Sequence, residues 1–234
     1  KLDYGNSLKN SQGQTINEAK GFVIGGSNIT VFAGWAPDGI DRNKTLKQQE
    51  DNLYGFGADG IDFAYVSLKD SAGTTYSTFK AQADYLAIFG IDPDIFQLKF
   101  SEVRFEYNSA SVAGKEIDYG LSNDGAGLDV PAGAGTVHLD MRGDKIGVYF
   151  GEVLLTISKF VYVRGSLAIE KATYPGLKDN KGRAITNASG FSIGGSNIDI
   201  FLGYAEDGIN QSKSFSEQAD KLSGLGAEGI DFGV

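Results

Sequence analysis

Short runs in which apolar and polar side chains alternate recur along most of the chain, with turn residues about every 8 to 15 positions between them. Alternation with a period of two is typical of β-strands. It is clearest from Thr136 to Lys171, where TVHLDM, KIGVYF, EVLLTI, FVYVRG and SLAIEK follow one another. No long helical pattern separates the runs, and parallel strands need long crossover connections. The sequence therefore predicts an all-β protein, an extended antiparallel β-meander or solenoid-like repeat array with room for one or two short helices in each repeat.

Turn signals set the expected strands of the first half. Gly25-Gly26-Ser27 indicates a hairpin between strands at Thr15–Gly25 and Asn28–Trp35. Asp-Gly and Asp-Pro-Asp sequences favour turns, and they stand at Asp38-Gly39, Asp59-Gly60 and Asp92-Pro93-Asp94.

Strands at Ile61–Leu68 and Ile95–Tyr107 are expected to follow the last two of these turns. Within Ile95–Tyr107 the apolar parity changes near Ser101-Glu102, which indicates a β-bulge.

The stretch Thr45–Gly57 fits either a short amphipathic helix or a polar strand. It resembles Ser77–Gly90 at an offset of 33 residues, and there Phe79, Ala81 and Tyr85 alternate with polar residues. Period two favours a strand for both stretches, whereas their Ala and Gln content keeps a helix open.

The middle of the chain carries weaker signals. Ser111–Tyr119 is expected to be a less regular strand, and the Gly-rich Ser122–Gly135 is expected to be a loop. Hairpin turns or bulges are expected at Arg142-Gly143-Asp144, Gly151-Glu152 and Arg164-Gly165-Ser166.

The chain contains a long internal repeat. Residues 21–65 align without a gap with residues 190–234, which lie 169 positions later, and 25 of the 45 pairs are identical. Residues 1–20 resemble residues 171–189 with a one-residue slip. Repeats this close indicate stacked structural units. We therefore expect a first complete unit at 1–170 and a truncated second unit at 171–234, in a fragment of a longer polypeptide.

Composition narrows the classes of function. The net charge is −9 and the pI about 4.6, which disfavours nucleic acid as a partner because binding phosphates requires clustered Lys and Arg. Cysteine is absent, so disulfides and thiolate chemistry are excluded. The sequence contains no run of about 18 apolar residues, the length that a transmembrane helix requires.

Several acidic turns could hold Ca²⁺, which prefers oxygen ligands. Asp-Gly is also a favoured turn pair in the absence of any metal, so both interpretations stay open. The candidate ligands are Asp38, Asp41, Asp59, Asp62, Asp207 and Asp231.

The remaining motifs give weaker indications of function. His138 is interpreted as an ordinary strand residue, because no nucleophile or orienting acid is marked beside it, and no enzyme is predicted. Arg142-Gly143-Asp144 spells an adhesion tripeptide that a hairpin turn also explains. Asn-X-Ser/Thr sequons, which matter only in a host that glycosylates them, begin at Asn28, Asn43, Asn187 and Asn210.

Two sequence blocks resemble modules of very large bacterial extracellular repeat proteins. One is the pattern aromatic-Lys-x-Gln-x-Asp-x-Leu-x-x-Phe-Gly followed by Asp-Gly-Ile-Asp-Phe, and the other is VHLDM with FVYVRGSLAIEK. The matching residues are Leu53–Phe63, Leu86–Phe96 and Phe160–Lys171. These proteins are adhesin-like, calcium-associated surface or fibre proteins. The resemblance implies secretion and a structural or adhesive role. It also implies calcium binding, from which this sequence departs at Asn197, where the calcium nonapeptide has a glycine.

These observations predict a structural segment of an extracellular or cell-surface fibre, stalk or layer. Its partners would be other copies of itself, because repeat units must stack to cover open sheet edges. A calcium-dependent adhesin module that binds glycan or a surface, and a β-groove lipid carrier, are the alternatives.

Overall fold

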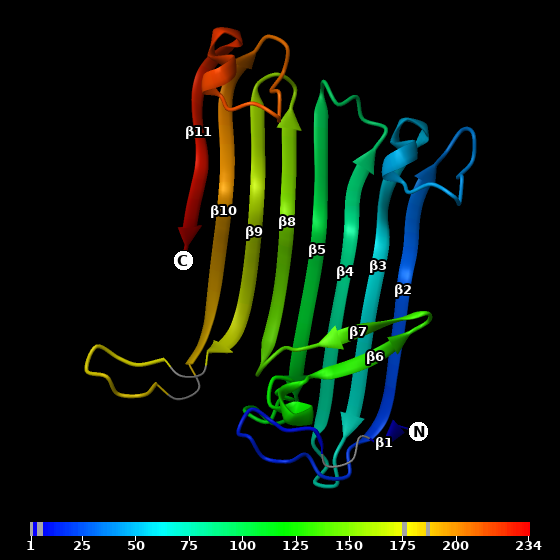
Figure 1. Cartoon of the computed structure of the whole chain (residues 1–234), viewed down its shortest axis with the longest axis vertical. Coiled ribbons are helices and arrows are strands. Elements are labelled where there is room, and N and C mark those ends of the chain that lie inside the picture. Colours follow the sequence, from blue (N-terminus) through cyan, green and yellow to red (C-terminus); the bar gives the residue numbers. More distant parts are fainter. Residues whose placement is uncertain (1, 4–6, 175–176, 186–187) are drawn as a thin grey trace.

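The computed structural model describes residues 2–3, 7–174, 177–185 and 188–234. They form one antiparallel sheet with the strand order β1-β2-β3-β4-β5-β8-β9-β10-β11 (Figure 1). Its strands are β1 (Leu2–Asp3), β2 (Lys20–Trp35), β3 (Tyr54–Lys69), β4 (Thr75–Phe89), β5 (Phe96–Ala110), β8 (Lys145–Ile157), β9 (Val161–Tyr174), β10 (Ala188–Ala205) and β11 (Leu222–Gly233). The all-β class and the antiparallel meander are confirmed. The large sheet is a single open layer, without the solenoid-like winding that was expected.

A separate hairpin interrupts the meander between β5 and β8. Its strands are β6 (Leu128–Ala132) and β7 (Gly135–Leu139). The hairpin turns back across β2 and β3 and lies on one face of the large sheet (Figure 1). The expectation of a loop over Ser122–Gly135 was therefore wrong for its second half. Among the described residues there are also three short 3-10 helices, η2 (Lys47–Asn52), η3 (Ser122–Gly125) and η4 (Ser216–Lys221).

β2 is one strand, so the hairpin expected at Gly25-Gly26-Ser27 was wrong. The chain instead makes a bulge at Asn28, whose φ is +54°, and the pairing with β3 shifts between Gly26 and Ile29. Likewise Asp59-Gly60 is not a turn, because β3 runs through it with a bulge at Gly60 (φ +64°). Residues that tolerate positive φ suit both a turn and a bulge, which explains the error.

Bulges recur at the same height on further strands and form a row across the sheet. The irregularity expected near Ser101-Glu102 is present, since Glu102 has φ +53° and pairs with neither β4 nor β8, but neither ladder changes register there. β8 and β9 each run unbroken past Gly151 and Gly165, where the register shifts. Asn197 and Gly229 repeat the first two bulges on β10 and β11. We call these positions the bulge row. Each bulge reverses which residue parity faces which side of the sheet.

The two stretches matched at an offset of 33 residues fold differently. Ser77–Gly90 contributes to β4 as expected, but Lys47–Asn52 is a 3-10 helix, so the strand expected over that part of Thr45–Gly57 was wrong. Leu46 and Leu53, on either side of the helix, are fully buried. A helical turn brings both leucines onto the sheet, and this tertiary packing overrides the local alternation.

Ser111–Tyr119 is not a strand either. It contains turns and a single bridge at Ile117. The side chain of Asn108 donates hydrogen bonds to the carbonyl oxygens of Ile117 (2.8 Å) and Gly143 (2.7 Å), which replaces part of a ladder. Arg142-Gly143-Asp144 lies in the connection between β7 and β8, which do not pair with each other, so the hairpin turn expected there was wrong.

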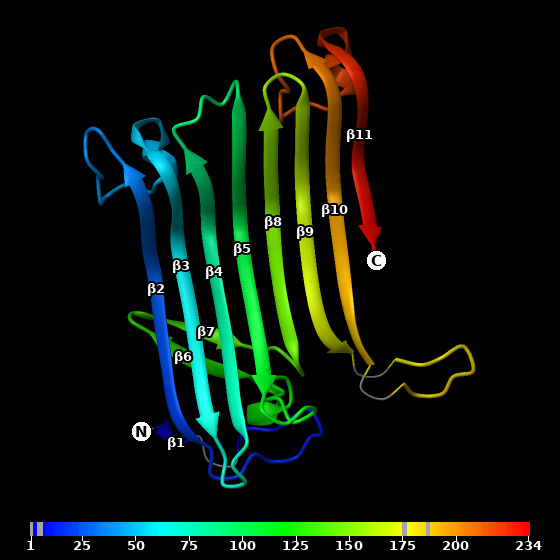
Figure 2. The ribbon, with the colours of Figure 1, turned by 180° about the vertical axis from the view of Figure 1, so that it is seen from behind.

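Most of the buried side chains lie on the face that carries the hairpin, here named the loop face. The largest cluster fills the space between the hairpin and β2 to β4, and includes Val66, Tyr76, Tyr119, Val130 and Leu139. Two smaller clusters lie under the loops that contain η2 and η4. The opposite face carries no second layer of described structure (Figure 2).

The internal repeat is also a structural repeat. β10, η4 and β11 reproduce β2, η2 and β3 in order, pairing and bulges. The boundary expected between residues 170 and 171 lies inside β9, so the sheet is continuous across the two units.

Candidate functional site: an apolar face and two open edges

Adjacent rows of residues across the sheet have opposite chemistry. One row reads Gly26, Phe63, Ala81, Phe105, Val148, Ile169 and Ile193 from β2 to β10. The row one residue away reads Gly25, Ala64, Lys80, Glu106, Gly147, Glu170 and Ser192. Side chains alternate between the faces of a strand, and the fully buried Ala64 lies under the hairpin. The first row therefore lies on the face away from the hairpin.

That face stays apolar above the bulge row. Val31, Ala58, Leu86, Phe100 and Val153 form the equivalent row there, because the bulges reverse the parity of each strand. We name this side of the sheet the apolar face. Its most exposed large side chains are Phe22, Ile24, Val31, Trp35, Tyr54, Phe56, Ile88, Ile146, Ile157, Phe191, Leu202, Tyr204, Leu225 and Phe232.

Aromatic rings lie across glycines on the apolar face. A Cβ atom added to Gly26 would come within 2.5 Å of the Phe63 ring, and one added to Gly195 would come equally near the Phe232 ring. The two glycines occupy equivalent places in the repeat. Glycine here lets a ring lie flat along the sheet, which keeps the face even.

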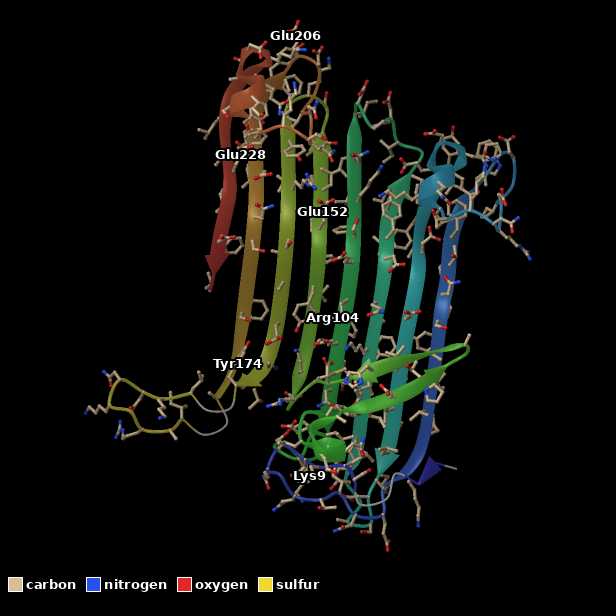
Figure 3. The ribbon with its side chains drawn as sticks, viewed as in Figure 1. Lys9, Arg104, Glu152, Tyr174, Glu206 and Glu228 are labelled. Carbon is tan, nitrogen blue, oxygen red and sulfur yellow. The ribbon has the colours of Figure 1, made fainter. Side chains whose placement is uncertain are left out.

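The loop face carries an ion-pair network where the hairpin does not cover it. Lys145 on β8 lies 2.9 Å from Glu106 on β5 and 3.1 Å from Glu170 on β9. Arg104 lies 3.2 Å from Glu106 and stacks over the ring of Tyr149. Arg104 projects from the middle of the sheet, with Glu152 higher up (Figure 3). Neither is part of a terminal loop.

The network shifts the pKa values of its members. Burial alone would raise the pKa of Glu170, but hydrogen bonds from Tyr149 and Lys145 lower it overall. Burial would lower the pKa of Lys145, yet its contacts with Tyr149 and Glu106 raise it. Burial, together with the bond to Glu170, raises the pKa of Tyr149 to about 12. The shifts of Glu170 and Lys145 favour their charged, paired states, and the shift of Tyr149 favours the neutral phenol that donates to Glu170.

A second charged contact attaches the hairpin to the sheet. The nearly buried Lys80 donates to the carbonyl oxygen of His138 and to Asp140, both at 2.9 Å. His138 lies in β7, as predicted, and its Nδ1 lies 2.8 Å from Asp129 on β6. These contacts position the hairpin over β4. They were not visible in the sequence because the partners are about 60 residues apart.

The six predicted calcium ligands are spread over the sheet and its loops. Asp62 and Asp231 accept hydrogen bonds from the backbone N–H of the bulge residues Asn28 (2.8 Å) and Asn197 (2.9 Å). Asp59 accepts from the backbone of Leu46 and from Thr30, and Asp207 pairs with Lys221.

The last two candidates lie in one loop at the upper end. Asp41 accepts from the backbone of Asn43, and the backbone N–H of Asp38 donates to Asn52. The described part of the chain contains no group of three His, Cys, Asp or Glu side chains placed to hold a metal. Calcium binding therefore stays a prediction, which a calorimetric titration would test.

Sequence reasoning missed the glutamine that organises the η2 loop. Gln49 accepts from the backbone of Asp41 and donates to the carbonyl oxygens of Asp41, Lys44 and Thr45. Gln218 makes the same four contacts in the second copy, with Asn210, Lys213 and Ser214. Its identity in both copies was the available signal, because most neighbouring polar residues change.

Of the four sequons, Asn28 lies at a bulge, whereas Asn43 and Asn210 lie in the loops that precede η2 and η4. Asn187 lies outside the described residues.

Both long edges of the sheet are largely open. β1 covers only the end of β2, at Lys20 and Gly21. β11 is the last strand in the order, and no strand of the described chain pairs with its outer edge. An open edge presents unpaired backbone N–H and C=O groups, which can pair with another strand.

A scan against protein-family models, a search of curated proteins and a search of solved structures each found no match. Within the described residues, no helix has the length and apolar character needed to cross a membrane.

Proposed function

We propose that the chain is a structural segment of a long secreted repeat protein, whose sheet grows sideways by β-strand pairing to form an extracellular fibre, stalk or surface layer. The observation that supports this most directly is the place of the repeat in the sheet. β10 and β11 continue the same sheet that begins with β2 and β3. One repeat is therefore a translation along the sheet by six strands, namely β2, β3, β4, β5, β8 and β9.

The pairing at the other edge has the same register. β1 pairs Leu2 with Gly21 and Asp3 with Lys20. The end of β9 pairs Ala172 with Gly190 and Thr173 with Ser189, which are the equivalent positions once the one-residue slip between residues 1–20 and 171–189 is counted. A strand like β9 is thus the natural partner of the β2 edge.

The edge of β11 has a natural partner too. β11 is the copy of β3, and β3 pairs along its length with β4. From Tyr54 to Ala64, seven of the eleven residues are identical in Ser223–Gly233. A strand like β4 should therefore pair with the β11 edge, and strands spaced about 4.8 Å apart would add about 29 Å of sheet per repeat.

A peptide of the β4 sequence, Thr75–Phe89, tests the proposal. We expect it to bind the whole chain and to slow backbone hydrogen exchange in Leu222–Gly233, whereas a scrambled peptide of the same composition does neither. Hydrogen exchange reports the protection of the backbone groups that a new ladder would cover. Equal binding of the two peptides, or no protection of β11, would contradict edge pairing.

The lipid-carrier alternative is favoured by one observation, the apolar face. Vesicle flotation, described in the next subsection, separates it from a structural role.

A further inference from the structure

The apolar face is too large to belong to an isolated soluble sheet. Eight long strands about 4.8 Å apart and about ten residues of 3.3 Å along each strand give roughly 1,300 Å². The largest apolar patch on an ordinary monomer is about 300 to 600 Å². A standard protein interface buries about 800 Å² on each partner. The face is therefore larger than the surface that a stable dimer needs.

Its chemistry matches the inner face of a β-sandwich. Two sheets packed face to face lie about 10 Å apart, with apolar side chains interdigitating and polar side chains pointing outward. Here the apolar row Phe63–Ala81–Phe105–Val148 lies one residue from the polar row that contains Lys80 and Glu106. The flat rings over Gly26 and Gly195 leave the surface even enough to receive another sheet.

The charge of the chain disfavours an anionic lipid surface as the cover. Attraction to anionic lipid requires clustered Lys and Arg, whereas the net charge is −9. At the lower end of the face Lys20 on β2 lies opposite Lys69 on β3, and the one charged residue further along is Lys171, opposite Ile146 and Phe191. Its long aliphatic stem allows the ammonium group to reach solvent at the rim.

We propose that the apolar face binds the apolar face of a second copy of this chain, so that two single-layer sheets form one two-layer sandwich. The hairpins, the 3-10 loops and the ion-pair networks then lie on the outside. A closed two-fold pair of this kind uses the same patch on both partners. It differs from edge pairing, which is open-ended, and it holds whether or not the edges extend the sheet.

The test measures the molar mass of the whole chain in solution by sedimentation and light scattering. We expect a dimer at micromolar concentration. The double substitution Ile146→Lys with Phe191→Lys should convert it to a monomer and increase the dissociation constant by at least 100-fold. Ile146 is 45% exposed and Phe191 is 62% exposed, so neither substitution removes a buried core residue.

The matched control is Leu177→Lys with Ile185→Lys. These residues are 45% and 42% exposed, and they lie in the loop between β9 and β10, which projects away from the sheet (Figure 1). The control should keep the dimer, and circular dichroism should show the same strand content in all three proteins. Equal loss of the dimer in the control would overturn the proposal, as would a monomeric parent chain.

Two further experiments distinguish dimerisation through the apolar face from lipid binding by that face and from pairing at a sheet edge. Flotation of the parent chain with neutral phosphatidylcholine vesicles, with the dimer absent, would assign the face to lipid and overturn the proposal. The β4 peptide should leave the dimer intact because it caps an edge. If the peptide dissociated the dimer, the contact would be an edge contact, and the face proposal would fail while the proposed function survived.

Discussion

At the scale of single residues, the polar side chains mainly hold backbone irregularities in place. Asp62 and Asp231 bond to the bulge residues Asn28 and Asn197, and Gln49 holds the loop before η2. The sequence shows these residues as candidate ligands because carboxylates beside glycines suit a metal as well as a bulge. Only the paired strands distinguish the two roles.

The bulges and the ion pairs differ in how well the sequence predicts them. The irregularity at Glu102 could be predicted because apolar residues flank it on both sides and reveal the change of parity. The bulges at Asn28 and Gly60 cannot be distinguished from turns in the sequence, because their flanking residues give no clear alternation. The network around Lys145 could not be predicted, since Glu106 and Glu170 become neighbours only through strand pairing.

Removing the charge of Glu170 should weaken the fold in a pH-dependent way. The folded state lowers the pKa of Glu170, so its contribution is fully present above its unfolded pKa and is lost as pH falls through the lower folded pKa. We expect Glu170→Gln to reduce the free energy of unfolding by about 1 to 3 kcal/mol at pH 7. Urea unfolding at several pH values measures this.

The difference between Glu170→Gln and the parent should shrink below about pH 4.5 and vanish once the carboxyl is protonated in the folded state. Lys145 adds no loss in this range, because its raised pKa keeps it charged until well above neutral pH. Glu102→Gln, on an exposed glutamate of β5, is the control and should have little effect. A deficit that is the same at pH 3 and pH 7 would exclude the ionic explanation.

At the scale of elements, the fold depends on the close packing of the β6–β7 hairpin against β2. A Cβ atom added to Gly25 would lie 2.3 Å from the carbonyl oxygen of Pro131 on β6. Ser27 also donates to the carbonyl oxygen of Ala132, at 2.5 Å. The sequence indicated a hairpin turn at this place, but the glycine instead allows β6 to approach β2 closely.

The two copies of the repeat offer a matched pair of substitutions. Gly25→Ala should destabilise the chain by about 1 to 3 kcal/mol, because the added methyl group forces the hairpin away from β2. Gly194→Ala is the equivalent change on β10, where the nearest atom would be 3.7 Å away, and it should be nearly neutral. Thermal unfolding of the two variants measures the difference, and equal losses would show that the hairpin contact is not the cause.

At the scale of the whole molecule, the repeat extends the sheet in one direction. The strand order follows the chain order except for the β6–β7 excursion. The sequence predicted the repeat and the meander, because both are local patterns. It did not reveal that one face would be mainly apolar, since the bulge row reverses the parity of the long strands half-way along.

A chain with one further copy of residues 21–189 should therefore become wider and keep its thickness. We expect the sheet to gain about 29 Å across its strands. Small-angle X-ray scattering of the parent and the lengthened chain measures this change. A gain in thickness without a gain in width would show that the second unit folds back instead of continuing the sheet.

The meander order also decides how an array of the proposed kind would carry tension. A pull along the array acts at right angles to every strand, so each ladder between neighbouring strands bears the whole load in series with the others. Within one ladder, the load is shared by all its hydrogen bonds at once. The breaking force of a stalk would then be set by its shortest ladder, whatever the free energy of unfolding of the repeat as a whole.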